Sequence, residues 1–246
     1  MLTTFTVANA SPTPNTPPVR MATLRSSSDL ANFAVGCDAD IGGKSEAILD
    51  YIPQSSGAGD EHGHGKFRGV LNPFVPESWK KTLEDGQTAK SGYAGFRTKT
   101  RTTLFGTACW DLSLHPYLAM RVRNNFKGDS KSGFFINIQT EGAVRTDLFQ
   151  HRLHIFGNDW QTLVVPLSSF VLTNAGETSD QQLPMLREKI RTVGLSLLAK
   201  PDGDKLGRVE NTQENFDLDI EWIEGWNDAE NGHKNDNQID EKAGNL

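Results

Sequence analysis

The segment His62-Gly63-His64-Gly65 holds the residues that most resemble part of a metal site. Histidines at positions i and i+2 of an extended loop can project to the same side, and neutral imidazole is a common ligand of transition metals. Asp60 and Glu61 precede them as further candidate ligands, but no cysteine and no third histidine lies nearby in the sequence. We therefore favour a flexible Gly/His loop and predict no metal site. A metal at His62 and His64 stays an open alternative.

Motifs for nucleotide binding and for nucleophilic catalysis are incomplete. Ile41-Gly42-Gly43-Lys44-Ser45 resembles the end of a phosphate-binding loop, yet Asp38 stands where the motif requires its first glycine. No G-x-S-x-G nucleophile elbow occurs. Cys109 precedes Trp110 and is followed by His115, but a Cys/His pair needs spatial contact. A buried cysteine beside a core tryptophan is the simpler interpretation.

Three acids, Asp217, Asp219 and Glu221, alternate with large apolar residues between Phe216 and Trp222. A pair of carboxylates could perform acid–base chemistry of the kind that hydrolyses glycosides. However, the chain has 31 acids, and nothing in the pattern selects two of them. We predict that these three side chains line a solvated outer face of a strand.

Polar side chains of several predicted strands form the remaining candidate site. The run from Ser91 to Arg97 combines glycines, aromatic residues and an arginine, and glycines in a strand let another backbone or a ligand approach closely. Alternation in the run 149–153 places Gln150 and Arg152 on one face. The simpler alternative is a solvated sheet face; the functional interpretation is a recognition surface. The residues that we assign to this partner-binding surface are Tyr93, Phe96, Arg97, Arg121, Asn137, Gln150 and Arg152.

Composition excludes several classes of protein. The 246 residues include 25 Lys and Arg against 31 Asp and Glu, and the net charge of −6 argues against general nucleic-acid binding. No apolar run approaches the length of a transmembrane helix. Two cysteines, Cys37 and Cys109, are too few for a disulfide scaffold, so we expect reduced thiols.

Period-two alternation of apolar and polar residues dominates the middle of the chain and predicts strands. It is clearest in Leu118–Arg123, Phe134–Gln139 and Phe216–Trp222. Shorter strand candidates are Ala47–Tyr51, Phe67–Leu71, Gly92–Arg97, Leu148–Ile155, Thr162–Leu167 and Val193–Leu198. Helical patterns are confined to Pro76–Leu83 and Leu183–Ile190. Many short strands with two short helices predict an all-β sandwich, because parallel βαβ units would need a helix between most strands.

The two ends of the chain differ in composition from its middle. The first 28 residues are rich in Ser, Thr and Pro and contain no acid, which predicts a flexible N-terminal arm over residues 1–30. Its alternative is the remnant of an organelle transit peptide. Residues 227–246 hold five acids and two lysines and predict a flexible acidic tail. The sandwich is therefore expected to span residues 31–226.

The ordered run of segments along the chain resembles the complex I intermediate-associated protein 30 family. Each segment alone is a weak signal, but their order and spacing are specific and extend from about Phe33 to Trp226. The segments are Asp40–Ser45, Phe67–Gly69, Ser91–Arg97, Leu118–Arg123, Asp147–Arg152, Trp160 with Pro166, and Val193–Ser196.

This resemblance implies a jelly-roll sandwich of the galactose-binding and carbohydrate-binding-module type. It implies a non-catalytic, cofactor-free chaperone for the assembly of mitochondrial respiratory complex I, located in the matrix and peripheral to the inner membrane. The expected partners are membrane-arm intermediates of complex I and a second assembly factor, which in fungi is a larger intermediate-associated protein. Membrane association would run through these partners. The alternative is a carbohydrate-binding module, for which the candidate stacking residues are Trp79, Trp110, Tyr117 and Trp160.

Overall fold

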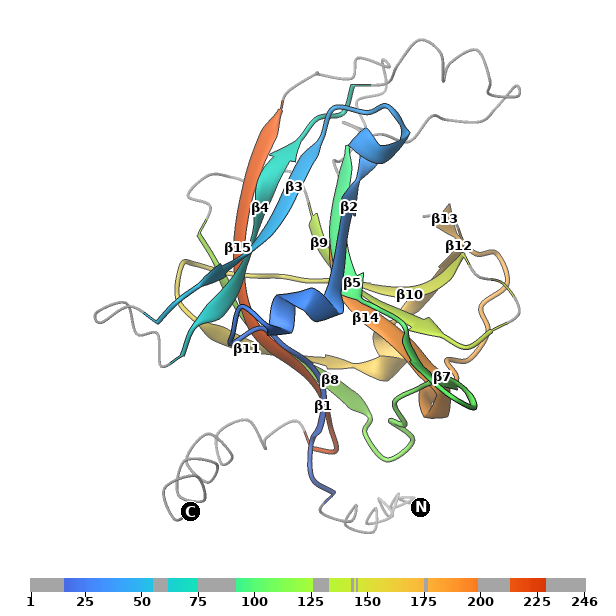
Figure 1. The fold of residues 1–246 in the computed structure, drawn as a ribbon. Helices are drawn as coiled ribbons and strands as arrows, with labels where there is room; N and C mark the ends of the chain where they lie inside the picture. Colours follow the sequence, from blue (N-terminus) through green and yellow to red (C-terminus); the bar gives the residue numbers. More distant parts are fainter. Residues whose placement is uncertain are drawn as a thin grey trace, which may run out of the picture.

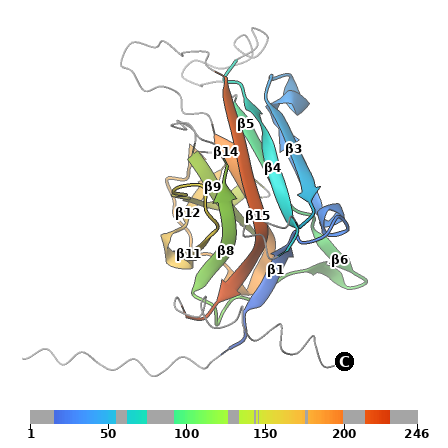
Figure 2. The same cartoon turned by 90° about the vertical axis from the view of Figure 1, so that its left-hand side faces the viewer.

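Nearly all regular structure in the described residues is β-strand, arranged as two antiparallel sheets that pack face to face (Figure 1). The computed structural model describes residues 16–54, 62–74, 92–125, 133–142, 144, 146–174, 177–198 and 213–228. In the view turned by 90°, one sheet, with β15 (Glu214–Trp226) and β8 (Tyr117–Asn124), lies in front of the other, with β14 (Ile190–Leu198) and β9 (Gly133–Thr140) (Figure 2). The molecule is therefore a β-sandwich, as the alternation of its sequence predicts.

Sheet A is built around one long strand. Within the described ranges it has six strands, in the order β11-β8-β15-β4-β3, with β1 also paired to β15. These strands are β11 (Gln161–Pro166), β8 (Tyr117–Asn124), β15 (Glu214–Trp226), β4 (His64–Leu71), β3 (Glu46–Ile52) and β1 (Val19–Thr23). β8 pairs with β15 from Leu218 onwards, whereas β4 pairs with its first half and β1 with its second half. Side chains of β15 consequently meet residues from three different strands.

Sheet B has seven strands in the described part of the chain, in the order β13-β12-β10-β9-β14-β5-β2. They are β13 (Glu177–Thr178), β12 (Val171–Asn174), β10 (Asp147–Arg152), β9 (Gly133–Thr140), β14 (Ile190–Leu198), β5 (Tyr93–Thr98) and β2 (Phe33–Cys37). Every pairing in this sheet is antiparallel. Residues that face each other across the sheet therefore form rows perpendicular to the strands.

A two-stranded hairpin and four short 3₁₀ turns complete the regular structure of the described residues. The hairpin consists of β6 (Arg101–Thr103) and β7 (Gly106–Ala108), which pair with each other. The 3₁₀ turns are η1 (Asp29–Asn32), η2 (Asp38–Ile41), η3 (Leu167–Ser169) and η4 (Arg187–Lys189). In this part of the chain no helix is long and apolar enough to cross a membrane.

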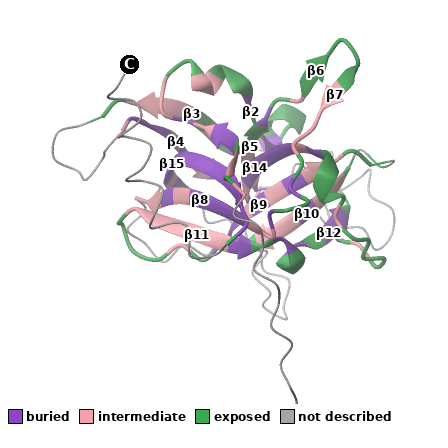
Figure 3. Ribbon diagram, turned by 90° about the horizontal axis from the view of Figure 1, so that it is seen from below, coloured by how far each residue is buried: buried purple, intermediate pink, exposed green. Residues whose placement is uncertain are grey.

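The core fills the space between the inner faces of the two sheets, where strand residues are buried (Figure 3). Phe67 of sheet A and Phe96 of sheet B meet there, with ring centroids 5.0 Å apart in an edge-on arrangement. Phe67 is fully buried and Phe96 is 3% exposed. Burying a side chain of this size stabilises a fold by about 1.5–3 kcal/mol. Phe96 is thus a core residue, so its assignment to the partner-binding surface is wrong.

The strand predictions are confirmed, but two predictions from local pattern are wrong in the described residues. Leu183–Ile190 is not a helix: only Arg187–Lys189 makes a 3₁₀ turn, and the strand β14 begins at Ile190. The predicted flexible arm includes β1, which is held by pairing with β15 about 200 residues later; Met21 in β1 and Leu24 just after it are buried. Residues 1–15, the predicted helix Pro76–Leu83 and residues 229–246 of the predicted tail lie outside the described residues.

Candidate functional site on the outer sheet faces

A ladder of neutral polar side chains crosses the outer face of sheet B. Gln150 on β10 lies opposite Asn137 on β9, and Asn137 lies opposite Gly194 on β14. The Gln150 Nε2 donates to Asn137 Oδ1 over 2.8 Å, and the Asn137 Nδ2 donates to Ser196 Oγ over 2.8 Å. The ladder therefore satisfies its own amide groups and connects three neighbouring strands. The sequence prediction that Asn137 and Gln150 share a face is confirmed.

Arg97 and Arg152 stand at opposite ends of this ladder, and both are exposed. Arg97 lies opposite Gly194 across the β5–β14 pair, and a Cβ at position 194 would be only 2.7 Å from that of Arg97 and 2.2 Å from the Phe96 carbonyl oxygen. Arg152 lies close to Gly133, where an added Cβ would be 3.1 Å from the arginine Nε. Glycines at these two positions let the arginine side chains lie close to the sheet.

Tyr93 belongs to the same face, at the other end of β5 from Arg97. It is half-buried, and burial together with the negative charges of Asp38 and Asp40 raises its pKa. We call the set Tyr93, Arg97, Asn137, Gln150 and Arg152 the sheet B platform.

Arg121 does not belong to the platform, because β8 lies in sheet A. Its Nε is 3.5 Å from Glu221 Oε1 on β15, and its guanidinium lies 5.7 Å from the ring centroid of Trp160. The prediction that Arg121 and Arg152 form one patch is therefore wrong: alternation locates a residue on a face of its strand, but it does not say which sheet the strand joins.

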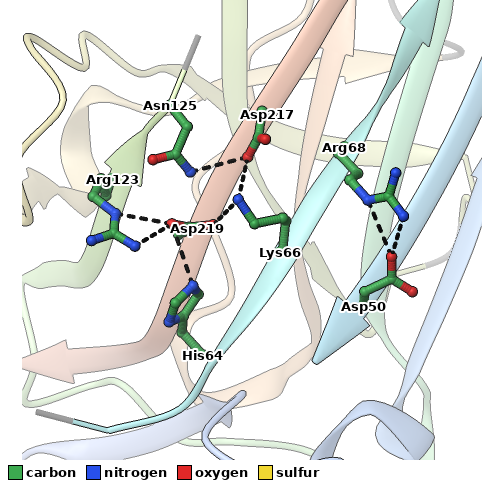
Figure 4. A network of polar contacts seen from close by, with 8 residues as sticks. All are labelled: Asp50, His64, Lys66, Arg68, Arg123, Asn125, Asp217 and Asp219. Atoms are coloured by element: carbon green, nitrogen blue, oxygen red, sulfur yellow. Dashed lines mark hydrogen bonds and ion pairs between the residues drawn. The ribbon is translucent and has the colours of Figure 1, made fainter. Parts of the chain in front are cut away.

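A network of charged side chains occupies the outer face of sheet A (Figure 4). Its centre is Asp219 on β15, which has no exposed surface. Arg123 on β8 donates to Asp219 Oδ2 from Nε over 2.9 Å and from Nη2 over 2.6 Å. Lys66 on β4 lies 3.1 Å from Asp219 Oδ1 and 2.9 Å from Asp217 Oδ1. Asn125 donates to Asp217 over 3.0 Å.

The electrostatics of this network favour its charged form. Burial alone would raise the pKa of Asp219, but the contacts of His64 and Arg123 outweigh burial and hold that pKa far below its usual range. Burial likewise opposes the charge on Lys66, yet the carboxylates of Asp217 and Asp219 raise the pKa of the lysine. The charges at the centre of the network are thus paired with each other.

His64 packs into this network rather than standing in a loop. It lies on β4, is 1% exposed, and its Nε2 is 3.3 Å from Asp219 Oδ2. The favoured interpretation of a flexible Gly/His loop is therefore wrong for His64, because strand pairing holds it. Among the described residues, no group of three or more histidines, cysteines or acids is placed to hold a metal ion.

Trp160 covers one side of the charge network. The Trp160 ring lies 5.3 Å from the His64 ring, centroid to centroid, and its centroid lies 4.6 Å from the guanidinium carbon of Arg123.

The other aromatic candidates for sugar stacking also pack against side chains of the protein. Further along β15, Trp222 and Trp226 pack with Tyr117. Trp110 lies under the guanidinium of Arg101, 3.8 Å from the ring centroid. The three described candidates for sugar stacking, Trp110, Tyr117 and Trp160, are half-buried, and none of them has a fully exposed ring face. Trp79 lies outside the described residues.

Sequence reasoning missed the charge network. The acids Asp219 and Glu221 are 0% and 2% exposed, so the prediction of a solvated strand face is wrong for both. A usable signal was present, because strands on either side of β15 carry cations at alternating positions: Lys66 and Arg68 on one, Arg121 and Arg123 on the other. Only the strand order makes these residues neighbours.

Comparison with protein families gives one match that covers most of the chain. A family model described as complex I intermediate-associated protein 30 matches residues 22–220. A Neurospora crassa protein named "Complex I intermediate-associated protein 30, mitochondrial" is 32% identical over 205 residues, which cover 76% of this chain and 70% of that protein. Proteins of the same name from Drosophila melanogaster and Mus musculus are 31% and 27% identical over 71% and 73% of this chain. The chain spans about half of their length, 54% and 51%.

Solved structures show the fold alone. A family 11 carbohydrate-binding module of a Clostridium thermocellum cellulase is similar with a TM-score of 0.53 at 10% identity, covering 88% of this chain and 98% of the module. The same module in complex with a mixed-linked tetrasaccharide gives a TM-score of 0.52 at 10% identity, with 85% and 95% coverage. The predicted jelly-roll sandwich of the carbohydrate-binding-module type is thereby confirmed.

Proposed function

The chain belongs to the complex I intermediate-associated protein 30 family, and from this premise we propose that it assists the assembly of mitochondrial respiratory complex I. It acts by binding and not by catalysis. Its partners are membrane-arm intermediates of complex I and a second, larger assembly factor. Its location is the mitochondrial matrix, at the surface of the inner membrane. The names of the relatives from fungus, fly and mouse, all mitochondrial, support the assignment.

The binding surface is the sheet B platform, and one observation carries this choice. Among the described residues, neither Arg97 nor Arg152 forms an ion pair with an acid, whereas Lys66 and Arg123 on sheet A are both paired with the buried carboxylate of Asp219. An exposed guanidinium that the fold itself does not neutralise can recognise a carboxylate of a partner. Arginine is also among the residues that contribute most to interface energy.

The neutral ladder supports this role by keeping the platform rigid. Because Gln150, Asn137 and Ser196 bond to one another, the floor between the arginines is ordered before a partner arrives. A preorganised surface loses less conformational entropy on binding. The arginines then provide the charged contacts and the ladder sets the spacing between them.

The test is affinity capture of the tagged protein from mitochondria, followed by mass spectrometry. We expect complex I membrane-arm subunits and a second assembly factor in the eluate of the wild-type protein. The double variant Arg97→Ala with Arg152→Ala should lower their recovery by about tenfold, as expected when two interface arginines are removed. The matched control, Arg68→Ala with Arg187→Ala, removes two exposed arginines from other surfaces and should leave recovery unchanged.

The outcomes separate the function from the surface. An eluate of the wild-type protein without any complex I subunit would overturn the assembly role itself. Unchanged recovery with the Arg97 and Arg152 variant would leave the assembly role standing and remove the platform as its interface.

The alternative, a carbohydrate-binding module, rests on fold similarity alone. The half-buried Trp160, Trp110 and Tyr117 pack against other side chains of the protein, so no specific contact favours it. A titration with mixed-linked glucan oligosaccharides that produces heat would revive this function.

A further inference from the structure

The β6–β7 hairpin ends in two large apolar residues that contact almost nothing. Leu104 is 97% exposed and Phe105 is 98% exposed. The next most exposed large apolar residue in the described chain, Phe156, is 77% exposed. Scattered apolar residues on a surface are ordinary, but adjacent leucine and phenylalanine side chains in full contact with water are unfavourable unless something covers them.

The hairpin holds this tip in a defined shape. The Thr103 hydroxyl donates to the Gly106 carbonyl over 3.1 Å and accepts from the Phe105 N–H over 3.2 Å. Gly106 has a φ of +125°, a conformation that side-chain-bearing residues rarely adopt. Within the part of the chain that the structure describes, β6 and β7 pair only with each other, and the hairpin projects from one corner of the sandwich (Figure 3). The two apolar side chains are thus presented at the end of an ordered arm.

The arm below the tip is basic. Residues 93–110 contain Arg97, Lys99 and Arg101 and no acid at all. Arg101 lies at the base of β6 and Lys99 just before it, and both are exposed. Where Trp110 pairs with Ile190 beyond the hairpin, Lys189 and Arg191 flank the pairing, and the acids at this end are Asp111, Glu141 and Glu188. An apolar tip on a basic arm therefore stands out from a chain whose net charge is −6.

We propose that the β6–β7 hairpin inserts Leu104 and Phe105 into the interface of an anionic phospholipid membrane. The apolar tip enters the boundary between headgroups and acyl chains, and Lys99 and Arg101 meet the phosphates above it. Charge complementarity favours an anionic membrane as the partner of the hairpin, because residues 93–110 carry three cations and no acid. The rest of the protein is acidic and would be repelled by an anionic surface. The contact also orients the sandwich, with this corner towards the membrane. It does not depend on the assembly role or on the sheet B platform.

The experiment is flotation of the full chain with unilamellar vesicles. One set consists of phosphatidylcholine alone, and the other also contains phosphatidylglycerol. The wild-type protein should float with the anionic vesicles, more weakly as salt rises. Leu104→Ser with Phe105→Ser should weaken binding by about tenfold or more, since the apolar groups that enter the membrane are removed. The matched control is Phe156→Ser with Leu183→Ser, which removes one exposed phenylalanine and one exposed leucine elsewhere and should change nothing.

A charge variant tests the other half of the proposal. Lys99→Gln should weaken binding to the anionic vesicles by about fivefold and make it less sensitive to salt. Because the altered side chains are exposed, thermal melts of all variants should match the wild type. The proposal is overturned if the wild-type protein ignores anionic vesicles, or if the tip variant floats as well as the wild type. If the tip variant keeps its vesicle binding but recovers fewer partner proteins in the affinity capture from mitochondria, the proposal is also overturned. The tip would then be a protein-docking element.

Discussion

The outer faces of the two sheets both carry polar side chains in register across neighbouring strands, but they place their arginines in opposite environments. On sheet A, Arg123 points at Asp219, a carboxylate with no exposed surface. On sheet B, Arg97 and Arg152 flank the neutral pair Gln150 and Asn137 and face solvent. Internal pairing makes the first face a structural element, whereas the second keeps its charges available. This difference is why we propose the second face, and not the first, as the recognition surface.

The largest effect should come from the core that both faces share. Phe96→Ala removes a 3% exposed ring that packs on Phe67 and Phe33, and the cavity should lower the free energy of unfolding by about 4 kcal/mol. Urea unfolding measures this value. Tyr93→Ala, three residues earlier on the outer face, is the control and should cost much less. Equal losses would mean that the two positions do not differ in burial as described.

The next largest effect should come from the charge network on sheet A. Asp219→Asn leaves Arg123 and Lys66 without their buried carboxylate, and it should lower the free energy of unfolding by about 3 kcal/mol. Asp50→Asn breaks the exposed pair with Arg68, so it should cost no more than about 0.5 kcal/mol. If both variants unfold at the same urea concentration, the network on sheet A is not a structural element.

The same carboxylate should make stability depend on pH. The pKa of Asp219 is held far below its unfolded value, so its contribution is present above the unfolded pKa of about 3.9 and is lost as pH falls towards the folded value. The difference in unfolding free energy between wild type and Asp219→Asn should therefore shrink by about 2 kcal/mol between about pH 5 and about pH 2. Urea titrations at stepped pH measure the difference. A gap that stays constant over this range would contradict the depressed pKa.

The smallest effect should be on the ladder of sheet B. Asn137→Ala removes hydrogen bonds to Gln150 and Ser196 that are only half-buried, and it should cost about 1 kcal/mol of unfolding free energy. Thermal and urea unfolding measure the change. A loss as large as that of Asp219→Asn would show that the ladder, too, is mainly structural, and the contrast between the two faces would fail.

Parts of the candidate site could be predicted from the residues because strands have a period of two. That period places Asn137 and Gln150 on one face of their strands, and the structure confirms that they meet. It also places Arg121 on a strand face, but the sheet to which that strand belongs depends on pairing with β15, about 100 residues away. Around Phe96, the run Tyr93–Arg97 contains both small and aromatic residues at alternating positions. Apolar/polar alternation in this run therefore did not show which side of the strand faces the core.

Local alternation and turn residues were sufficient for the all-β class and for most strand positions, because these depend on neighbours within a few residues. The pairing of β1 with β15 and the burial of Asp219 depend on contacts between segments 90 or more residues apart. The alternating charges of these strands can be read from the sequence, but neither segment alone indicates which strands lie beside it. The tertiary structure therefore decided which charges neutralise each other, which arginines remain exposed, and that Leu104 and Phe105 stand at the tip of a projecting hairpin.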